Sequence, residues 1–227
     1  MSQSVFYNSY ASHKRYTTPE MGKKQIKRFD QMVWRPAECQ STHRFLEIGC
    51  GTGAFLAYLA AKGCTQFKGI DQDPALEAVI PDAARGHFVC LDVWAALDDP
   101  TLGDLDRVVA LDVLEHFTPE DAIKLLAALK ARLVPGGRMV IKVPNASSPW
   151  GLQYQNGDLT HRTAYTPLSI AQVANAAGFK TATVLPHRQG SRRRMITDRL
   201  VHGVLSWALL TPPDIWTANL VAVFETA

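Results

Sequence analysis

The residues with the clearest capacity for chemistry form the run Leu46-Glu47-Ile48-Gly49-Cys50-Gly51-Thr52-Gly53. Its three glycines, Gly49, Gly51 and Gly53, allow a tight turn in which backbone N–H groups approach a ligand, because glycine has no Cβ. In dinucleotide-binding proteins such a turn holds a pyrophosphate. Here Glu47 stands just before the first glycine, and its carboxylate would repel a phosphate at short range. The run therefore favours a ligand that carries positive charge.

Further carboxylates, Asp71, Asp92 and Asp112, stand at or beside the ends of the next predicted strands. In an open α/β sheet, ligands bind outside the carboxyl ends of the strands. Asp71 follows the first glycine by about twenty residues, the spacing at which an acid reaches a ribose hydroxyl pair. Asp92 could accept a hydrogen bond from an adenine amino group while Val93 covers the ring. One such Asp is often only a helix N-cap, but a series around a glycine turn favours a nucleoside site.

Two histidines are placed to act as a general base toward a second substrate. His116 follows the fourth predicted strand, in Asp112-Val113-Leu114-Glu115-His116, and His161 lies in the segment 158–167 after the fifth. The alternative is that each histidine only caps or packs. Glu115 could likewise bind the ligand or cap its helix. The chain shows no spacing typical of a metal site, and we predict no metal.

Strands and helices alternate from Arg44 onward, which predicts an α/β fold with a doubly wound, mostly parallel sheet. A helix is expected from Thr18-Pro19 to Trp34, and the turn Pro135-Gly136-Gly137 is expected to precede the fifth strand. The predicted strands are 45–48, 66–70, 87–91, 106–111, 138–143, 180–185 and 219–224. The main predicted helices are 54–62, 119–133 and 167–177.

The 227 residues are expected to form a single domain, because this length suits one α/β unit with a substantial core. We divide it into an N-terminal extension or lid (1–42), a core (43–185), an insertion (186–218) and a last strand (219–227). No internal repeat or low-complexity linker interrupts it.

Cysteine usage is typical of a cytoplasmic protein, and the charge gives no sign of a nucleic-acid partner. The formal net charge of +3 does not by itself indicate nucleic acid, and we do not expect a nucleic-acid partner. The four cysteines lack metal-ligand spacing, and Cys50 and Cys90 are expected to be reduced core thiols. The N-terminus shows no secretory signal, and the apolar stretch 200–210 is too short to span a bilayer.

With these motifs, the chain resembles the class I S-adenosylmethionine-dependent methyltransferases of the small-molecule type. The glycine run, Gly69-Ile70-Asp71, Leu91-Asp92-Val93 and the run from Leu111 to His116 match that family's motifs in order, over residues 43–183. The resemblance implies a Rossmann-like, seven-stranded sheet with an antiparallel last strand. S-adenosylmethionine has an ammonium and a sulfonium and no phosphate, which agrees with Glu47.

The resemblance also implies roles for individual residues. Glu47 and the three glycines would hold the methionine part of the cofactor, Asp71 with Gln72 the ribose, and Asp92 with Val93 the adenine, with Asp112 nearby. His161, in the segment 158–167, would lie on the acceptor side, because that segment is similar to one in sugar-directed members of the family. The fourth strand lacks the proline-rich run of enzymes that methylate DNA bases.

The insertion 186–218 is expected to govern the choice of acceptor. Three consecutive arginines, Arg192 to Arg194, precede Leu200, Val204 and Trp207. One interpretation is a packed helix with a solvated basic end. The other is a surface for an anionic head group, as in a phosphate-bearing lipid-linked sugar, or peripheral membrane contact through 192–210.

We therefore predict a methyltransferase that acts on a hydroxyl or amine of a small-molecule, glycan or lipid-linked sugar acceptor. Three alternatives stay open: an RNA methyltransferase, a nucleotide-dependent oxidoreductase with the same loop, and a non-catalytic relative that serves as a partner subunit.

Overall fold

A seven-stranded sheet forms the centre of the molecule in the computed structural model, which describes residues 16–99 and 102–226. The strand order is β3-β2-β1-β4-β5-β7-β6. Neighbouring strands run parallel except β7, which is antiparallel to both β5 and β6. The strands are β1 (Phe45–Ile48), β2 (Phe67–Asp71), β3 (Phe88–Cys90), β4 (Leu105–Leu111), β5 (Leu133–Pro144), β6 (Thr181–Pro186) and β7 (Asn219–Glu225). The predicted fold class, including the antiparallel last strand, is confirmed.

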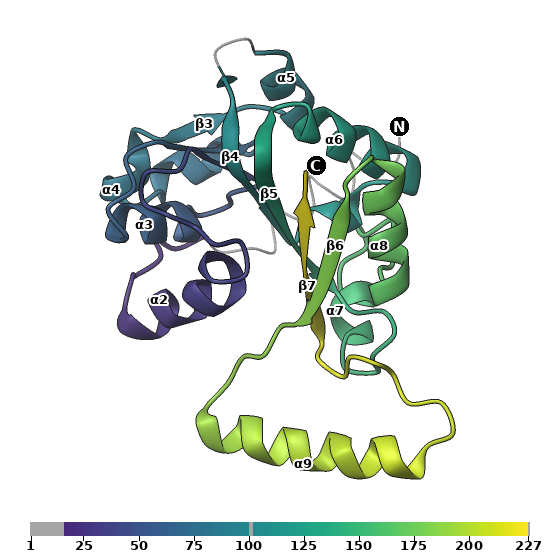
Figure 1. The fold of residues 1–227 in the computed structure, drawn as a ribbon. Helices are drawn as coiled ribbons and strands as arrows, with labels where there is room; N and C mark the ends of the chain where they lie inside the picture. Colours follow the sequence, from purple (N-terminus) through teal and green to yellow (C-terminus); the bar gives the residue numbers. More distant parts are fainter. Residues whose placement is uncertain (1–15, 100–101, 227) are drawn as a thin grey trace.

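Helices cover both faces of this sheet (Figure 1). One face carries α2 (Lys23–Phe29), the π-helical turn η1 (Asp30–Trp34), α3 (Ala54–Ala61) and α4 (Asp82–Arg85), and the other carries α5 (Val93–Asp98), α6 (Pro119–Lys130) and α8 (Pro167–Ala176). All four residues of β1 are buried, because this strand lies inside the sheet with a helical layer on each side. The short elements η2 (Pro74–Ala78), η4 (Leu114–His116) and α7 (Leu152–Asn156) follow carboxyl ends of strands.

The order of the strands reverses beside β1, which pairs with β2 on one side and β4 on the other. Such a switch point opens a crevice at the carboxyl ends of the strands. The glycine turn leaves β1 at this edge, and η4 leaves β4 beside it. The fold thus brings the predicted ligand-binding motifs to one edge of the sheet.

Two local predictions were wrong. The first helix begins at Lys23 and not at Thr18-Pro19, because Gly22 takes an extended conformation as N-cap. The fifth strand begins at Leu133, opposite Leu105, so Pro135-Gly136-Gly137 is no separate turn. Instead the pairing register of β4 with β5 shifts between Leu105 and Arg107. This bulge accommodates Gly136, whose backbone is left-handed, within the strand.

The 187–218 segment leaves the sheet between β6 and β7 and carries the helix α9 (Arg192–Ala208). β6 ends and β7 begins where β5 ends, because Asn219 pairs with Pro144 and Leu220 with Pro186. α9 therefore extends from the same carboxyl edge that carries the glycine turn. Figure 1 shows it set apart from the layered body.

Three of the four free cysteines are buried, among them Cys50 as predicted. Cys90 is only half-buried, because β3 is the edge strand of the sheet. Its prediction as a core thiol was therefore wrong.

Candidate functional site

The glycine turn between β1 and α3 depends on three left-handed glycines, Gly49 (φ +62°), Gly51 (+51°) and Gly53 (+76°). A Cβ on Gly49 would lie 2.5 Å from Cγ2 of Val113, so the turn packs closely against the segment after β4. A Cβ on Gly51 would meet nothing within 4 Å. The backbone at Gly51 therefore faces open space, as a cradle for a ligand requires.

Glu47 is the buried carboxyl group of the turn, with 3% of its surface exposed. Its Oε2 accepts no hydrogen bond from the residues that the structure describes. Burial, and secondarily the nearby Asp71, raise the pKa of Glu47 well above its usual value. A buried carboxyl without a partner is costly, and a cationic ligand such as the ammonium of S-adenosylmethionine would compensate it.

Asp71, the last residue of β2, ties the turn to the second strand. Its two carboxylate oxygens accept hydrogen bonds from the backbone N–H groups of Gly51, at 2.9 Å, and Asp73, at 3.1 Å. We call Glu47, Gly49, Gly51, Gly53 and Asp71 the donor site. They combine a buried carboxyl group, an open backbone turn and a carboxylate at a strand end.

The other predicted cofactor residues lie around the donor site. Asp92 caps α5 by accepting a hydrogen bond from Trp94 N–H at 2.9 Å, the structural role that the sequence left open. Val93 is half-buried and packs on the core, while Gln72 is exposed. Asp112 has a left-handed backbone (φ +58°) and pairs with Lys142 of β5. Its carboxylate is thus held where β4 and β5 end.

The N-terminal extension also reaches the donor side. Tyr16 donates a hydrogen bond from its hydroxyl to Asp73 Oδ2 at 2.8 Å. Burial and this bond raise the pKa of Tyr16 to about 12. Sequence reasoning missed this contact, and residues 1–15 of the predicted extension lie outside the described residues.

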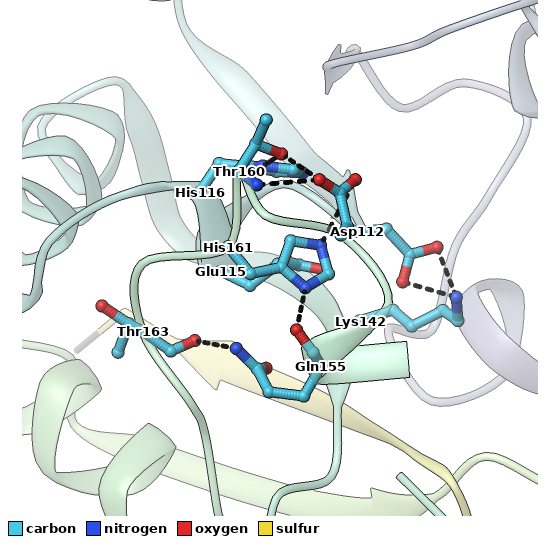
Figure 2. A network of polar contacts seen from close by, with 9 residues as sticks. Asp112, Glu115, His116, Lys142, Gln155, Thr160, His161 and Thr163 are labelled. Atoms are coloured by element: carbon cyan, nitrogen blue, oxygen red, sulfur yellow. Dashed lines mark hydrogen bonds and ion pairs between the residues drawn. The ribbon is translucent and has the colours of Figure 1, made fainter. Parts of the chain in front are cut away.

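A second group, Glu115, His116 and His161, lies beyond the end of β4, and we call it the acceptor cluster. Their ligating atoms all lie within 4.8 Å of one another. The rings of His116 and His161 meet edge to face with centroids 4.7 Å apart, and His161 Nε2 lies 4.0 Å from Glu115 Oε1 (Figure 2). The structure therefore brings together both predicted histidines, and adds Glu115 between them.

Backbone contacts hold the two halves of the acceptor cluster together. The carbonyl oxygen of Glu115 accepts from the N–H groups of Arg162, at 2.7 Å, and Thr163, at 3.1 Å. Thr163 also donates its hydroxyl to the carbonyl of Phe117 at 2.6 Å. The loop that carries His161 is thus docked on η4, which carries Glu115 and His116.

Polar residues that sequence reasoning missed orient the two rings. His161 Nδ1 lies 3.0 Å from the carbonyl of Gln155, and His116 Nδ1 lies 2.9 Å from Thr160 Oγ1. Thr160 donates its hydroxyl to Asp158 Oδ1 at 2.6 Å. Thr160 and Asp158 lie in the segment predicted for the acceptor side, but no local pattern assigned them a role.

Glu115 is the most deeply buried ionisable group of this cluster, with none of its surface exposed. Neither of its carboxylate oxygens accepts a hydrogen bond from any described residue. Burial, reinforced by the charge of Asp112, raises the pKa of Glu115 to about 8. Among the described residues, none donates a hydrogen bond to this carboxyl group.

The helix α9 overturns the prediction of a packed helix, because none of its residues is buried. It touches the body through His202, which accepts a hydrogen bond from Trp150 Nε1 at 2.8 Å and stacks on Trp216. Another side of the helix, together with Arg188 before it, lines a groove of about 720 Å³; the helix residues there include Arg192, Arg199, Leu200, Val204 and Trp207. Within the described ranges, no helix is long and apolar enough to cross a bilayer.

Comparisons with known proteins agree with this geometry. The model of a family described as a methyltransferase domain matches residues 21–184. A tRNA U34 carboxymethyltransferase from Pseudoalteromonas translucida is 36% identical over 104 residues, which are 43% of this chain and 30% of that protein. The chain spans between 25% and 42% of the length of the curated relatives that it matches.

Solved structures share the fold over almost the whole chain. A SAM-dependent methyltransferase from Archaeoglobus fulgidus aligns over 100% of both chains with a TM-score of 0.66 and 18% identity. Magnesium protoporphyrin IX methyltransferase from Synechocystis PCC 6803, solved with bound SAH, covers 99% of this chain and 95% of its own, with a TM-score of 0.57 and 14% identity.

The sheet order and the family match favour a methyltransferase over the oxidoreductase alternative. The chain belongs to the methyltransferase-domain family and has the fold of S-adenosylmethionine-dependent methyltransferases.

Proposed function

We propose that the enzyme methylates a hydroxyl or amine of a small-molecule, glycan or lipid-linked sugar acceptor that carries an anionic group. The observation that carries the proposal is the placement of the donor site, the acceptor cluster and the arginine-lined groove of α9 along one edge of the sheet.

At the donor site, Glu47 pairs with the ammonium of the cofactor and Gly51 lets its methionine part approach the backbone. Asp71, with Gln72, binds the ribose hydroxyls, while Asp92 and Val93 contact the adenine. The N-terminal extension covers this site, and the hydrogen bond from Tyr16 to Asp73 supports that role. Together these contacts hold the sulfonium methyl group at the switch point of the sheet.

At the acceptor cluster, His161 or His116 removes the proton of the acceptor. The acceptor's lone pair then forms a bond to the methyl carbon, and the carbon–sulfur bond breaks with its electron pair left on sulfur. Much of the rate in such a displacement comes from holding the two reactants in line. The burial of Glu115 and the docked loop around His161 support a rigid, water-poor site.

The groove of α9 supports an acceptor with both an anionic and an apolar part. Arg188, Arg192 and Arg199 supply guanidinium groups that suit a phosphate or carboxylate, while Leu200 and Trp207 supply apolar surface. A lipid-linked sugar has both. Its lipid part would follow the groove while its sugar reaches the acceptor cluster.

The test is a methyl-transfer screen with labelled S-adenosylmethionine against pools of small molecules, glycolipids and RNA. We expect label in a small-molecule or glycolipid pool, and we expect Arg192→Gln together with Arg199→Gln to lower the rate at limiting acceptor. Arg85→Gln, on an exposed side chain far from α9 in the sequence, is the matched control. If the RNA pool is labelled and the small-molecule and glycolipid pools are not, the proposal is overturned.

RNA methylation is the second candidate, because the relative from Pseudoalteromonas translucida is named for tRNA and α9 is basic. Binding of RNA through α9 would fall steeply with salt. Binding that is already weak at low salt and is insensitive to Arg192→Gln would count against it.

We also propose peripheral membrane contact through residues 192–210. Trp207 and Leu210, at the far end of α9 from its basic start, have 87% and 100% of their surfaces exposed. A basic helix with one apolar side lies in the interface of anionic bilayers. Vesicles that contain anionic lipid should retain the protein at low salt, whereas vesicles of neutral lipid should not. Absence of retention on both would refute the contact.

A further inference from the structure

Glu115 is a buried carboxyl group that lacks a hydrogen-bond donor among its described neighbours. The carboxyl is fully buried, and neither oxygen receives a hydrogen bond from any residue in the described part of the chain. Lys142, a nearby cation, pairs with Asp112 instead (Figure 2). A buried carboxyl group without a partner either keeps its proton or, when ionised, needs a cation such as a metal ion beside it.

The two histidines beside Glu115 are oriented as metal ligands are. His161 Nδ1 lies 3.0 Å from the carbonyl of Gln155, which can only accept, so Nδ1 carries the proton and Nε2 carries the lone pair. That Nε2 is the atom that lies 4.0 Å from Glu115 Oε1. Metal-binding histidines usually donate their other ring N–H to a carbonyl or carboxylate in this way.

A chain of hydrogen bonds orients His116 by the same principle. Thr160 donates its hydroxyl proton to Asp158, so Thr160 Oγ1 accepts from Nδ1 of His116 at 2.9 Å. Because Nδ1 of His116 donates in this chain, the lone pair of His116 lies on Nε2.

From this geometry we infer that Glu115, His116 and His161 bind one divalent first-row transition ion, such as Zn²⁺. Ligands at about 2.1 Å from zinc lie roughly 3.4 Å apart in a tetrahedral site. The ligating atoms here lie within 4.8 Å of one another, so the side chains need to converge by about an ångström. Two imidazoles and one carboxylate favour such an ion over Mg²⁺, which prefers oxygen ligands.

Three protein ligands leave a coordination position for the acceptor. The role of the ion rests on the proposed function, although its binding does not. An ion held by these three residues would lower the pKa of a bound acceptor hydroxyl, whose proton would pass to solvent. The acceptor oxygen would then form its bond to the methyl carbon as the carbon–sulfur electron pair goes to sulfur. With the ion bound, His116 and His161 act as its ligands, and the role of general base proposed above applies to the metal-free cluster.

The test is titration of the full-length, chelator-treated protein with ZnCl₂ alone, followed by calorimetry. We expect one ion per chain with a dissociation constant of about 1 µM or below. Glu115→Gln and His161→Ala should each weaken binding roughly 100-fold. His43→Ala, which removes a half-buried histidine outside the cluster, should leave it unchanged. Zinc should raise the melting temperature of the unaltered protein but not of Glu115→Gln.

Cobalt gives a spectroscopic check, since Co²⁺ in the site should produce visible absorption that Glu115→Gln abolishes. Affinity for S-adenosylhomocysteine should be equal in all of these variants, which separates loss of the metal from misfolding of the donor site. Zinc affinity that is weaker than about 100 µM, or unchanged in Glu115→Gln and His161→Ala, would overturn the inference. Zinc binding without transfer to any hydroxyl would refute the proposed acceptor and leave the metal site standing.

Discussion

At the donor site, the ionisable groups sit in or at the end of strands of a sheet that is covered on both faces, whereas at the acceptor cluster they come from a short turn and a loop. Asp71 ends β2 and bonds directly to the glycine turn. Glu115 and His161 meet only because the loop 158–163 docks on η4. Beyond that cluster, α9 buries none of its residues. The donor site is thus built into the core, and the part proposed to select the acceptor is attached to it.

If the donor site belongs to the core, titration of Glu47 must affect the stability of the whole protein. Its folded-state pKa lies well above the unfolded value of 4.5, so the folded protein retains a proton that the unfolded chain releases. Stability from this group is therefore lost as pH rises above 4.5. Between pH 5 and pH 8 the loss is at most about 4 kcal/mol.

Urea unfolding of the protein and of Glu47→Gln at both pH values measures this effect. Glu47→Gln should lose less stability over the interval, because its amide does not titrate. Equal losses of stability in the two proteins would mean that Glu47 does not titrate as a buried group.

On the acceptor side, Gly151 is closely packed against backbone atoms. A Cβ there would lie 2.0 Å from the carbonyl oxygen of Asn145, which is backbone and cannot move aside. Gly151→Ala should destabilise the protein by about 3 kcal/mol. Gly203→Ala in α9 adds the same methyl group with nothing within 4 Å, and its melting temperature should not fall. Equal losses of stability in Gly151→Ala and Gly203→Ala would contradict the view that α9 is attached to the body without packing on it.

A substitution at Asp71 removes one of the two hydrogen bonds that its carboxylate accepts from Gly51 and Asp73. Asp71→Asn replaces one of two acceptor oxygens, so either Gly51 or Asp73 loses its hydrogen bond. Affinity for S-adenosylhomocysteine should fall roughly 10- to 100-fold, or about 1.5–3 kcal/mol. Asp82→Asn, on a side chain that is 94% exposed, is the control for calorimetry. Unchanged affinity in Asp71→Asn would remove Asp71 from the cofactor site.

The smallest effect is expected at α9. Trp207→Ser should change the free energy of unfolding by no more than about 0.5 kcal/mol, because 87% of the Trp207 surface is already in water. The same substitution should lower the rate at limiting acceptor. A fall in stability comparable to that of a core substitution would mean that α9 packs on the body in solution.

The donor half of the site was predictable because its signals are local. A glycine with positive φ is recognisable from the sequence, and so is a carboxylate at a strand end, as Gly51 and Asp71 show. Asp92 illustrates the limit of such signals. Its observed bond is the cap on α5, which was the alternative reading of the same pattern.

The acceptor half was only partly predictable because its contacts are long-range. His116 and His161 were identified separately, but their meeting at Glu115 depends on a docked loop and on Thr160 and Gln155. No spacing in the sequence indicates that meeting. For α9 the basic and apolar order was visible in the sequence, whereas the absence of packing depends on how β6 and β7 direct the segment away.

The segment that carries α9 starts and ends on two strands that already pair, with Pro186 of β6 opposite Leu220 of β7. The entropic cost of closing a loop between such fixed ends grows only slowly with its length. Segments of other lengths and compositions can therefore be exchanged at this point while the strand register and the glycine turn stay the same. Such exchanges at one hairpin would change the surface beyond the carboxyl edge of the sheet while the strands that carry the donor site stay as they are.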